Sequence, residues 1–393
     1  MLSLSSCLLP VTSGTRLHRV RMAGITLGLL TLAANHAAAT TYHAYIIDTP
    51  ATFAATHGTG VSSGTYVGYA VDGGGTSNAF SWTGAPAALT ATNLNTTGSY
   101  SAAYGISNGQ NVGFIDVSGA PHAAILTASA ATDLNPTGAT TSLAYTTNGS
   151  TQVGVADSIL TAWTGTAANA VPVTEPAAFN AETFEFNTAI TAQLAPPAID
   201  STGAIVATGT STSYLHAFLW SSPTATPTDL NPGGTFFSTS IVRGVDGGRQ
   251  VGEAYFDPAH PALGTNEQNH PVLWSGSASS VQVLPLTSDF TGASPNSISG
   301  SQIVGTGYTA TSEHAILWDN LSTDGPIDLQ PAGYYSSQAL SIDADGVIIG
   351  VVQLAADSTS TQAVIWVPDS IPEPATLGMM GLGVVGLLAR KRR

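Results

Sequence analysis

The stretch Val304-Gly305, followed nine residues later by His314-Ala315-Ile316-Leu317-Trp318, decides the fold because related copies recur along most of the chain. Six copies end in Trp and one ends in Leu, at intervals of 37 to 57 residues. A hydrophobic residue and a Gly precede each copy, with Thr208-Gly209 as the loosest example. The Trp position is held by Trp82, Leu126, Trp163, Trp220, Trp274, Trp318 and Trp366.

Each repeat of roughly 45 residues predicts four strands. Asn-Gly or Asp-Gly turns, Thr and β-branched residues are frequent, and no helical periodicity is visible. Several copies end in a short element such as Asp133-Leu134-Asn135. One four-stranded unit cannot bury both of its faces, whereas radial stacking buries them all. We therefore predict an all-β fold, a seven-bladed β-propeller, with a β-solenoid or a six- or eight-bladed propeller as the alternative.

The last repeat lacks a fourth strand, because Trp366 runs almost directly into the C-terminal segment. Residues 42–48 form an isolated strand-like segment before the first repeat. Pairing these two partners would remove two exposed sheet edges at once. We predict that residues 42–48 pair with the blade that contains Ile365 and Trp366 and so close the ring.

The composition excludes several classes of function. Only 8% of the 393 residues are charged, and the formal net charge is -15. Residues 40–370 contain 23 acidic residues and only two cations, Arg243 and Arg249, so we predict no nucleic-acid partner. The single cysteine, Cys7, precedes this body, which excludes disulfides and Cys-based metal sites within it. The body also has no Lys, which excludes Schiff-base chemistry.

The N-terminal residues predict export. Three arginines precede an apolar run over residues 23–34, and Ala37-Ala38-Ala39 follows as a signal-peptidase site. About a dozen apolar residues are too few to span a bilayer, which needs about 20. We therefore predict a signal peptide over residues 1–39, and a start at Met22 would leave that prediction unchanged.

The C-terminal residues have three consecutive parts. Pro372-Glu373-Pro374 is followed by an apolar, Gly-rich segment over residues 375–389, which predicts a short transmembrane helix. A basic cluster ends the chain and predicts a cytoplasmic stop-transfer signal. The chain thus divides into residues 1–39, a repeat body over 40–370 and a tail over 371–393. The four basic residues of the tail are Arg390, Lys391, Arg392 and Arg393.

This tail resembles the PEP-CTERM sorting signal of Gram-negative bacteria. The resemblance implies that exosortase, a membrane cysteine transpeptidase, cuts at or near Pro372, Glu373 and Pro374. It also implies that the tail anchors the protein transiently in the inner membrane before the body reaches the envelope or the exterior.

The repeats resemble the bacterial extracellular HAF repeats, named for the sequence seen here as His216-Ala217-Phe218. The resemblance covers residues 58–367, and the unit that ends at Trp163 departs from it because it lacks the His-Ala pair. It implies export and repetition, and it implies no activity.

Four histidines at the repeat position, His122, His216, His270 and His314, could suggest a metal site. Equivalent positions on successive blades lie around a ring, however, so they do not converge. We predict instead that each His bonds the backbone of a neighbouring blade.

Two motifs in turns have a structural explanation. Asp343-Ala344-Asp345-Gly346 opens like a calcium loop, but Leu354 stands where an EF-hand needs Glu, so we predict a hairpin turn. Residues 60–64 match the nucleophile-elbow pattern around Ser62, but they fall in a hairpin turn rather than between a strand and a helix.

Two insertions break the repeat length and are the better candidates for a site, since binding loops are often grafted onto a rigid scaffold. The first spans residues 171–197, with an extra strand over 183–191, and the second spans residues 252–274. The first contains Glu175, Phe179, Glu182, Phe184, Glu185 and Phe186, and the second contains Glu253, Asp257, His260, Glu267 and His270.

Together these patterns predict an exported, non-catalytic propeller at the cell surface or in the extracellular matrix. Signal peptidase and exosortase are its predicted processing partners, and no catalytic residue, metal or cofactor is predicted. The association of such tails with exopolysaccharide-producing bacteria suggests a polysaccharide partner. The alternative is a carbohydrate-active enzyme that uses acids of the 171–197 and 252–274 insertions.

Overall fold

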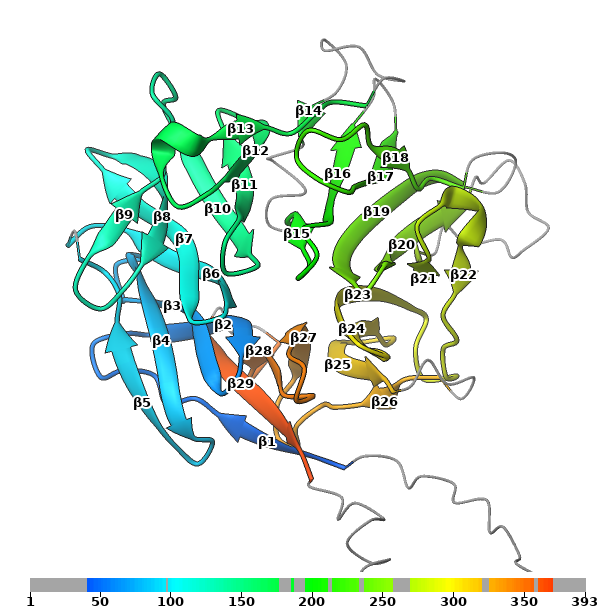
Figure 1. Cartoon of the computed structure of the whole chain (residues 1–393). Helices are drawn as coiled ribbons and strands as arrows, with labels where there is room; N and C mark the ends of the chain where they lie inside the picture. Colours follow the sequence, from blue (N-terminus) through cyan, green and yellow to red (C-terminus); the bar gives the residue numbers. More distant parts are fainter. Residues whose placement is uncertain are drawn as a thin grey trace, which may run out of the picture. The chain divides into compact units, whose positions relative to one another are not determined.

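The computed structural model describes residues 41–96, 98–176, 185–186, 195–210, 214–232, 237–256, 269–319, 325–356 and 360–369. These residues all belong to the unit Ala39–Arg393, and they form seven antiparallel sheets around a common axis (Figure 1). The predicted seven-bladed propeller is confirmed, and a solenoid or another blade number is excluded. The predicted signal peptide over residues 1–39 and the tail over 371–393 lie outside the described residues.

Blades 1 to 3 each consist of four consecutive strands, the first of them innermost. Blade 1 contains β2 (Ala55–Ser62), β3 (Thr65–Val71), β4 (Ser77–Ala85) and β5 (Ala88–Asn93); blade 2 contains β6 (Ser101–Ser107), β7 (Gln110–Val117), β8 (Ala120–Leu126) and β9 (Ala131–Asp133); blade 3 contains β10 (Ser142–Thr147), β11 (Gln152–Ala156), β12 (Ile159–Trp163) and β13 (Val171–Pro172).

Blades 4 to 6 follow the same order, and the innermost position of blade 4 is shared by two short strands. Blade 4 contains β14 (Glu185–Phe186), β15 (Ala198–Ile199), β16 (Ile205–Thr210), β17 (Leu215–Trp220) and β18 (Thr228–Asp229); blade 5 contains β19 (Phe237–Asp246), β20 (Arg249–Phe256), β21 (Asn269–Trp274) and β22 (Gln282–Val283); blade 6 contains β23 (Gly292–Ser299), β24 (Gln302–Tyr308), β25 (Glu313–Trp318) and β26 (Ile327–Asp328).

Blade 7 joins the two ends of the described chain. Its inner strands are β27 (Ser336–Ile342), β28 (Ile348–Gln353) and β29 (Thr361–Pro368), and β1 (Tyr42–Ile46) adds the outermost strand (Figure 1). In this pairing Ala44 lies opposite Trp366 and Tyr45 lies opposite Ile365. The predicted closure of the ring by residues 42–48 is therefore confirmed.

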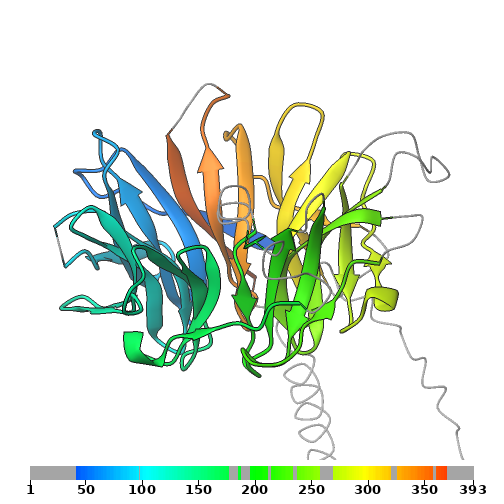
Figure 2. The ribbon, with the colours of Figure 1, turned by 90° about the horizontal axis from the view of Figure 1, so that it is seen from above.

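The hydrophobic core lies between the blades. Seven clusters of buried side chains each fill one interface between neighbouring sheets, which stand side by side around the axis in Figure 2. The Trp of each repeat packs on the preceding blade; Trp366, for example, lies among Val304 and Leu317 of blade 6. Its indole N–H donates to the carbonyl oxygen of Leu329 at 2.8 Å. Six interfaces contain this Trp, and Leu126 takes its place between blades 1 and 2. Burial of one large side chain at each interface explains why the phrase recurs.

The repeat Gly lies opposite a β-bulge in the innermost strand. In blade 6, Gly305 pairs with Pro295, and the register shifts between Pro295 and Ser297. A Cβ at Gly305 would overlap the carbonyl oxygen of Ser294. Five other blades repeat this arrangement, with Gly68, Gly113, Gly154, Gly252 and Gly350.

The strand pairing in blade 4 changes which residue is equivalent to the repeat Gly. In the other blades the repeat Gly pairs with the residue two positions before the residue at the Trp position. In blade 4 the residue two positions before Trp220 is Phe218, and it pairs with Ala207. The assignment of Thr208-Gly209 to this position was therefore wrong. Strand β15 pairs with Ile205 and Val206 and β14 pairs with Gly209 and Thr210, so Ala207 lies between the two paired segments.

A buried hydroxyl connects neighbouring blades at the Ala of the repeat. The backbone N–H of Ala315 in blade 6 donates to Ser337 Oγ on the innermost strand of blade 7, at 2.9 Å. Five interfaces share this bond, which we call the hydroxyl latch. The acceptors are Thr56 Oγ1 and the Oγ atoms of Ser101, Ser142, Ser240 and Ser337.

Candidate functional site

The central channel is lined by the ends of all seven innermost strands. Its volume there is about 270 Å³. Each blade contributes an apolar residue or Thr followed by Ser, Thr or Asp, so that small hydroxyls and three carboxylates surround the channel. The seven pairs are Val61-Ser62, Ile106-Ser107, Thr146-Thr147, Ile199-Asp200, Val245-Asp246, Ile298-Ser299 and Ile342-Asp343.

Two of these carboxylates bind neighbouring turns. Asp343 Oδ1 accepts the N–H groups of Asp345 and Val347 at 3.0 Å, and Oδ2 accepts that of Ser63 in blade 1 at 3.1 Å. Burial raises the pKa of Asp343, and these hydrogen bonds oppose that change. Asp246 Oδ2 accepts the N–H of Gly300 in blade 6 at 2.7 Å. The predicted hairpin turn at residues 343–346 is confirmed, and it also joins the last blade to the first.

A buried ion pair lies beside the channel at the bulge of blade 5. Arg243 Nε and Nη2 donate to Glu253 Oε1 at 2.8 and 2.6 Å, and the Tyr255 hydroxyl donates to Oε2 at 2.9 Å. The Glu253 side chain is 2% exposed. Burial and the nearby Glu253 carboxylate raise the pKa of Tyr255, so its hydroxyl stays protonated. Glu253 was predicted as a site residue, and the structure places it in a strand with its charge balanced.

For His122, His216 and His314 the structure shows a different partner from the predicted backbone of a neighbouring blade, and the expectation for His270 stays a prediction. Nδ1 of His122, His216 and His314 contacts a carboxylate of the same blade at 2.8, 2.8 and 2.9 Å. The acceptors belong to the short Asp-Leu element on the outermost strand: Asp133, Asp229 and Asp328. The sequence analysis treated the His and the Asp as separate features. Only the pairing of the third strand with the fourth, seen in the structure, brings them together.

The same Asp connects its blade to the hydroxyl latch. In blade 2, Asp133 Oδ1 accepts the N–H of Asn135 at 2.7 Å, and Asn135 Oδ1 accepts the hydroxyl of Ser142 at 2.6 Å. Ser142 in turn accepts the N–H of Ala123. The His, Ala, Asp and Asn of the repeat therefore form one network that orders the interface between two blades.

His270 has a different environment, because Val283 occupies the position that Asp holds in blades 2, 4 and 6. Burial lowers the pKa of His270. It lies on β21 opposite Ala254, while Glu253 lies opposite Pro271. The other members of the second insertion, Asp257, His260 and Glu267, lie outside the described residues.

The first insertion is described only in part. Glu175 is exposed in the segment after β13, and Glu185 and Phe186 form β14, which pairs with Thr210 and Gly209. The extra strand predicted over residues 183–191 is thus seen as these two residues. Phe179, Glu182 and Phe184 lie outside the described residues, as do the tail residues Pro372 to Pro374 and Arg390 to Arg393.

Sequence reasoning missed an aromatic cluster that extends over blades 1 to 3. Tyr104 and Tyr145 occupy the bulges of blades 2 and 3, and their rings stack at 5.3 Å. Tyr69 contacts Tyr104 edge-on at 6.4 Å and stacks on His57 at 4.6 Å. Burial raises the pKa of all three tyrosines. The bulge could have been located from the repeat Gly, which lies opposite it.

Within the described ranges, no three His, Cys, Asp or Glu side chains come together as metal ligands. The same part of the chain contains no helix long and apolar enough to cross a membrane.

The chain combines a seven-bladed β-propeller body with a C-terminal protein-sorting motif. Residues 370–393 match the PEP-CTERM protein-sorting motif, which confirms the resemblance of the tail. No curated protein matches the chain in sequence. The resemblance of the body to HAF repeats stays a prediction.

Solved structures with a similar arrangement are distant in sequence. The β-propeller domain of the Trilobed protease from Pyrococcus furiosus is 9% identical, with a TM-score of 0.47, over 80% of this chain and 95% of that chain. Pyrococcus horikoshii acylaminoacyl peptidase is 12% identical, with a TM-score of 0.48, over 82% of this chain and 51% of its own. A mutant Aleuria aurantia lectin in complex with alpha-methyl-L-fucoside is 12% identical, with a TM-score of 0.37, over 85% of this chain and 97% of its own. Likenesses this distant carry no argument about what the present chain binds.

Proposed function

We propose that the protein is exported, cut by exosortase at its tail and released to the cell surface or the extracellular matrix. The match of residues 370–393 to the PEP-CTERM protein-sorting motif carries this proposal. Signal peptidase removes residues 1–39, and the tail anchors the protein transiently in the inner membrane of a Gram-negative cell. The basic cluster Arg390 to Arg393 keeps the end of the chain on the cytoplasmic side.

The propeller itself acts as a non-catalytic body that associates with extracellular polysaccharide. Its described acids support a structural role, because Glu253 is neutralised by Arg243 and Asp343 and Asp246 join neighbouring blades. The three repeat aspartates are likewise engaged by histidines.

The sorting half of the proposal is tested in the native cells by replacing Pro372, Glu373 and Pro374 with Ala. We expect the wild-type protein in the surface or culture fraction at a reduced mass, and the triple variant in the inner membrane with its tail attached. Cell fractionation and intact mass measure both. Unchanged processing of the triple variant would contradict the proposal, and Asp369→Asn serves as the matched control.

The polysaccharide half is tested by co-sedimentation of the full chain with exopolysaccharide purified from the same cells. We expect the protein to sediment with the polymer without releasing soluble sugar. Release of reducing ends that stops on Glu182→Gln or Glu267→Gln would instead support the enzyme that uses acids of the two insertions.

A further inference from the structure

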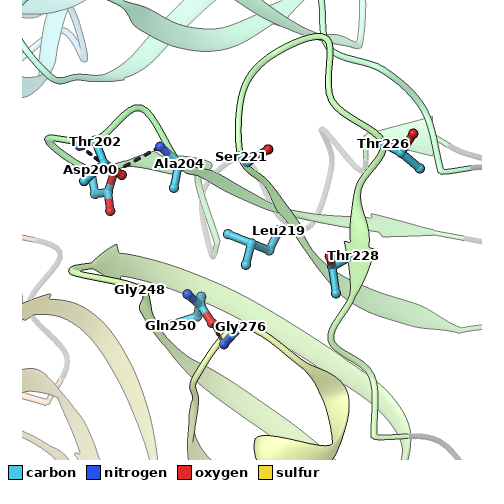
Figure 3. A pocket seen from close by; sticks show the side chains of 10 residues that line it. All are labelled: Asp200, Thr202, Ala204, Leu219, Ser221, Thr226, Thr228, Gly248, Gln250 and Gly276. Atoms are coloured by element: carbon cyan, nitrogen blue, oxygen red, sulfur yellow. Dashed lines mark hydrogen bonds between the residues drawn. The ribbon is translucent and has the colours of Figure 1, made fainter.

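A cavity of about 200 Å³ lies between blades 4 and 5, beside the turns that lead into their second strands (Figure 3). Asp200, Ala204 and Leu219 come from the blade 4 side, and Gly248 and Gln250 come from the blade 5 side. Leu219 is partly buried and provides an apolar wall. The remaining lining residues are Thr202, Gly276 and the exposed Ser221, Thr226 and Thr228.

Two buried polar atoms of the lining residues have no hydrogen-bond partner. They are Asp200 Oδ2 and Gln250 Nε2, in residues that are 4% and 0% exposed. The other ends of both side chains are fixed: Asp200 Oδ1 accepts the N–H groups of Thr202 and Ala204, and Gln250 Oε1 accepts that of Gly276 at 2.9 Å. Because Gly276 donates to the oxygen of the Gln250 amide, the nitrogen is the atom left over. A buried donor or acceptor without a partner is costly to the folded state, so such atoms usually have a hydrogen-bond partner.

The interface between blades 2 and 3 contains the hydrogen-bond acceptor that Gln250 lacks between blades 4 and 5. Gln152 is the counterpart of Gln250, since each lies two residues before the repeat Gly and accepts a backbone N–H two residues after the Trp. Gln152 Nε2 donates to Gln110 Oε1 of blade 2 at 2.7 Å. Blade 4 has Ala204 at the position of Gln110, three residues before the repeat position. The smaller side chain leaves open the place that Gln110 fills and leaves the Gln250 amide without its acceptor.

The chemistry of the lining selects a ligand class. Asp200 Oδ2 needs a donor and Gln250 Nε2 needs an acceptor, and a hydroxyl group can serve as either. A metal ion is disfavoured because only one of the lining residues is a carboxylate and the amide N–H would repel a cation. An anion is disfavoured because no lining residue is a cation and the body is strongly acidic. The volume is smaller than the roughly 300–1,000 Å³ of drug-sized sites, so it has room for one small ring.

We propose that this cavity binds one neutral sugar residue, with vicinal hydroxyls bridging Asp200 and Gln250 and a C–H face of the ring on Leu219. The site deepens the proposed association with polysaccharide, and it rests on that proposal for the source of the sugar. The sorting motif plays no part in sugar binding at this cavity. Co-sedimentation with the polymer depends on every surface of the protein that contacts it, and not on this cavity alone. A result at this cavity is therefore separable from both.

The test titrates the full chain with methyl α- and β-glycosides of glucose, galactose and mannose, and with methyl glucuronoside as an anionic probe. Calorimetry and saturation-transfer NMR measure binding. We expect at least one neutral glycoside to bind, and Asp200→Asn to weaken it at least tenfold, because the acceptor facing the sugar becomes a donor. Asp157→Asn is the matched control, since Asp157 also accepts backbone N–H groups in a turn and lies in blade 3.

Ala204→Gln is the decisive variant because it copies the arrangement of Gln110 between blades 2 and 3. We expect it to fill the cavity, give Gln250 Nε2 an acceptor, abolish glycoside binding and leave the melting temperature equal or higher. If no neutral glycoside binds the wild type, if methyl glucuronoside binds more tightly, or if binding survives in both variants, the proposal is overturned and the cavity holds water only. A cooperative melting transition for each variant shows that lost binding does not reflect unfolding.

Discussion

Blade 4 differs from the other six blades at the position of the repeat Gly, where it has Ala207. Six blades need Gly there because the bulge of the innermost strand brings a carbonyl oxygen against the Cα. In blade 4 the innermost position is divided between β14 and β15, and Ala207 lies between the residues that pair with them. The Gly pattern of the six other blades therefore follows from the geometry of their innermost strands.

The buried His57 makes folding depend on pH. Its ring stacks on Tyr69 at 4.6 Å, and its Nε2 contacts Thr361 Oγ1 of blade 7 at 3.0 Å. Burial lowers the pKa of His57 to about 4, from an ordinary value of 6.5. As pH falls, the unfolded chain binds this proton first, so the contribution of neutral His57 to folding is present above pH 6.5 and lost as pH falls toward 4.

We expect His57→Phe to reduce the loss of unfolding free energy between pH 7 and pH 4.5 by about 1–3 kcal/mol, because Phe keeps the stacking and cannot be protonated. Denaturant titrations at both pH values measure this. His43→Phe is the control, since the His43 side chain is 62% exposed and pairs with Asp369 at the edge of blade 7. Equal losses in wild type and His57→Phe would exclude this role for His57.

At the scale of elements, neighbouring sheets are joined through the hydroxyl latch as well as through apolar packing. Ser337 is 1% exposed, and it accepts the Ala315 N–H while donating to Gln330 Oε1. At the equivalent place in blade 5, Pro271 has no N–H, and Ser294 Oγ instead contacts the Tyr308 hydroxyl at 2.6 Å. The described residues show the latch at five of the seven interfaces, and the interface between blades 5 and 6 has this other contact instead.

We expect Ser337→Ala to lower the free energy of unfolding by about 1–3 kcal/mol, because it leaves the buried Ala315 N–H and the Gln330 amide oxygen without a partner. Thermal or chemical unfolding measures the change. Ser337→Thr should keep most of the stability, since Thr56 performs the same role between blades 7 and 1. A similar loss in both variants would show that packing, and not the hydroxyl, is what matters at this position.

At the scale of the whole propeller, stability depends on closing the ring. Strand β1 pairs with β29 along its whole length, and the Ile47 N–H donates to the Ala363 carbonyl oxygen at 2.8 Å. Ile47 is 2% exposed in the cluster between blades 7 and 1. The same bond recurs in the other blades from a Leu or Val on the outermost segment, so β1 supplies to blade 7 what each other blade has from its own sequence.

We expect deletion of residues 41–48 to abolish the single cooperative unfolding transition or to lower its midpoint by more than 10 °C, because it exposes the edge of β29. Calorimetry measures the transition. Added peptide with the sequence of residues 41–48 should restore part of the loss, and a scrambled peptide should not. A deletion variant that melts like the wild type would show that the ring does not need this strand.

Much of the architecture could be predicted because short, contiguous sequence patterns specify its strands and turns, and these patterns recur in seven repeats. Each Trp phrase encodes a third strand, each Asn-Gly or Asp-Gly encodes a hairpin, and the missing fourth strand of the last repeat predicts the closing strand. At Asn108-Gly109 both residues have positive φ, 50° and 76°, as an Asn-Gly hairpin turn requires. The sorting tail is likewise a short contiguous pattern, and its family model matches.

The candidate site could not be predicted in the same way. Ala204 and Gln250 are unremarkable as single residues, and they matter only because two sheets face each other and one interface lacks the side chain that fills the other. The partner of each repeat His and the pairing of Glu253 with Arg243 also depend on which strands lie side by side. The sequence by itself determined the number of blades, the closure and the sorting signal, because repetition and contiguous motifs report short-range geometry. Only the tertiary structure decided which polar atoms are satisfied and where a cavity remains, because both depend on contacts between blades.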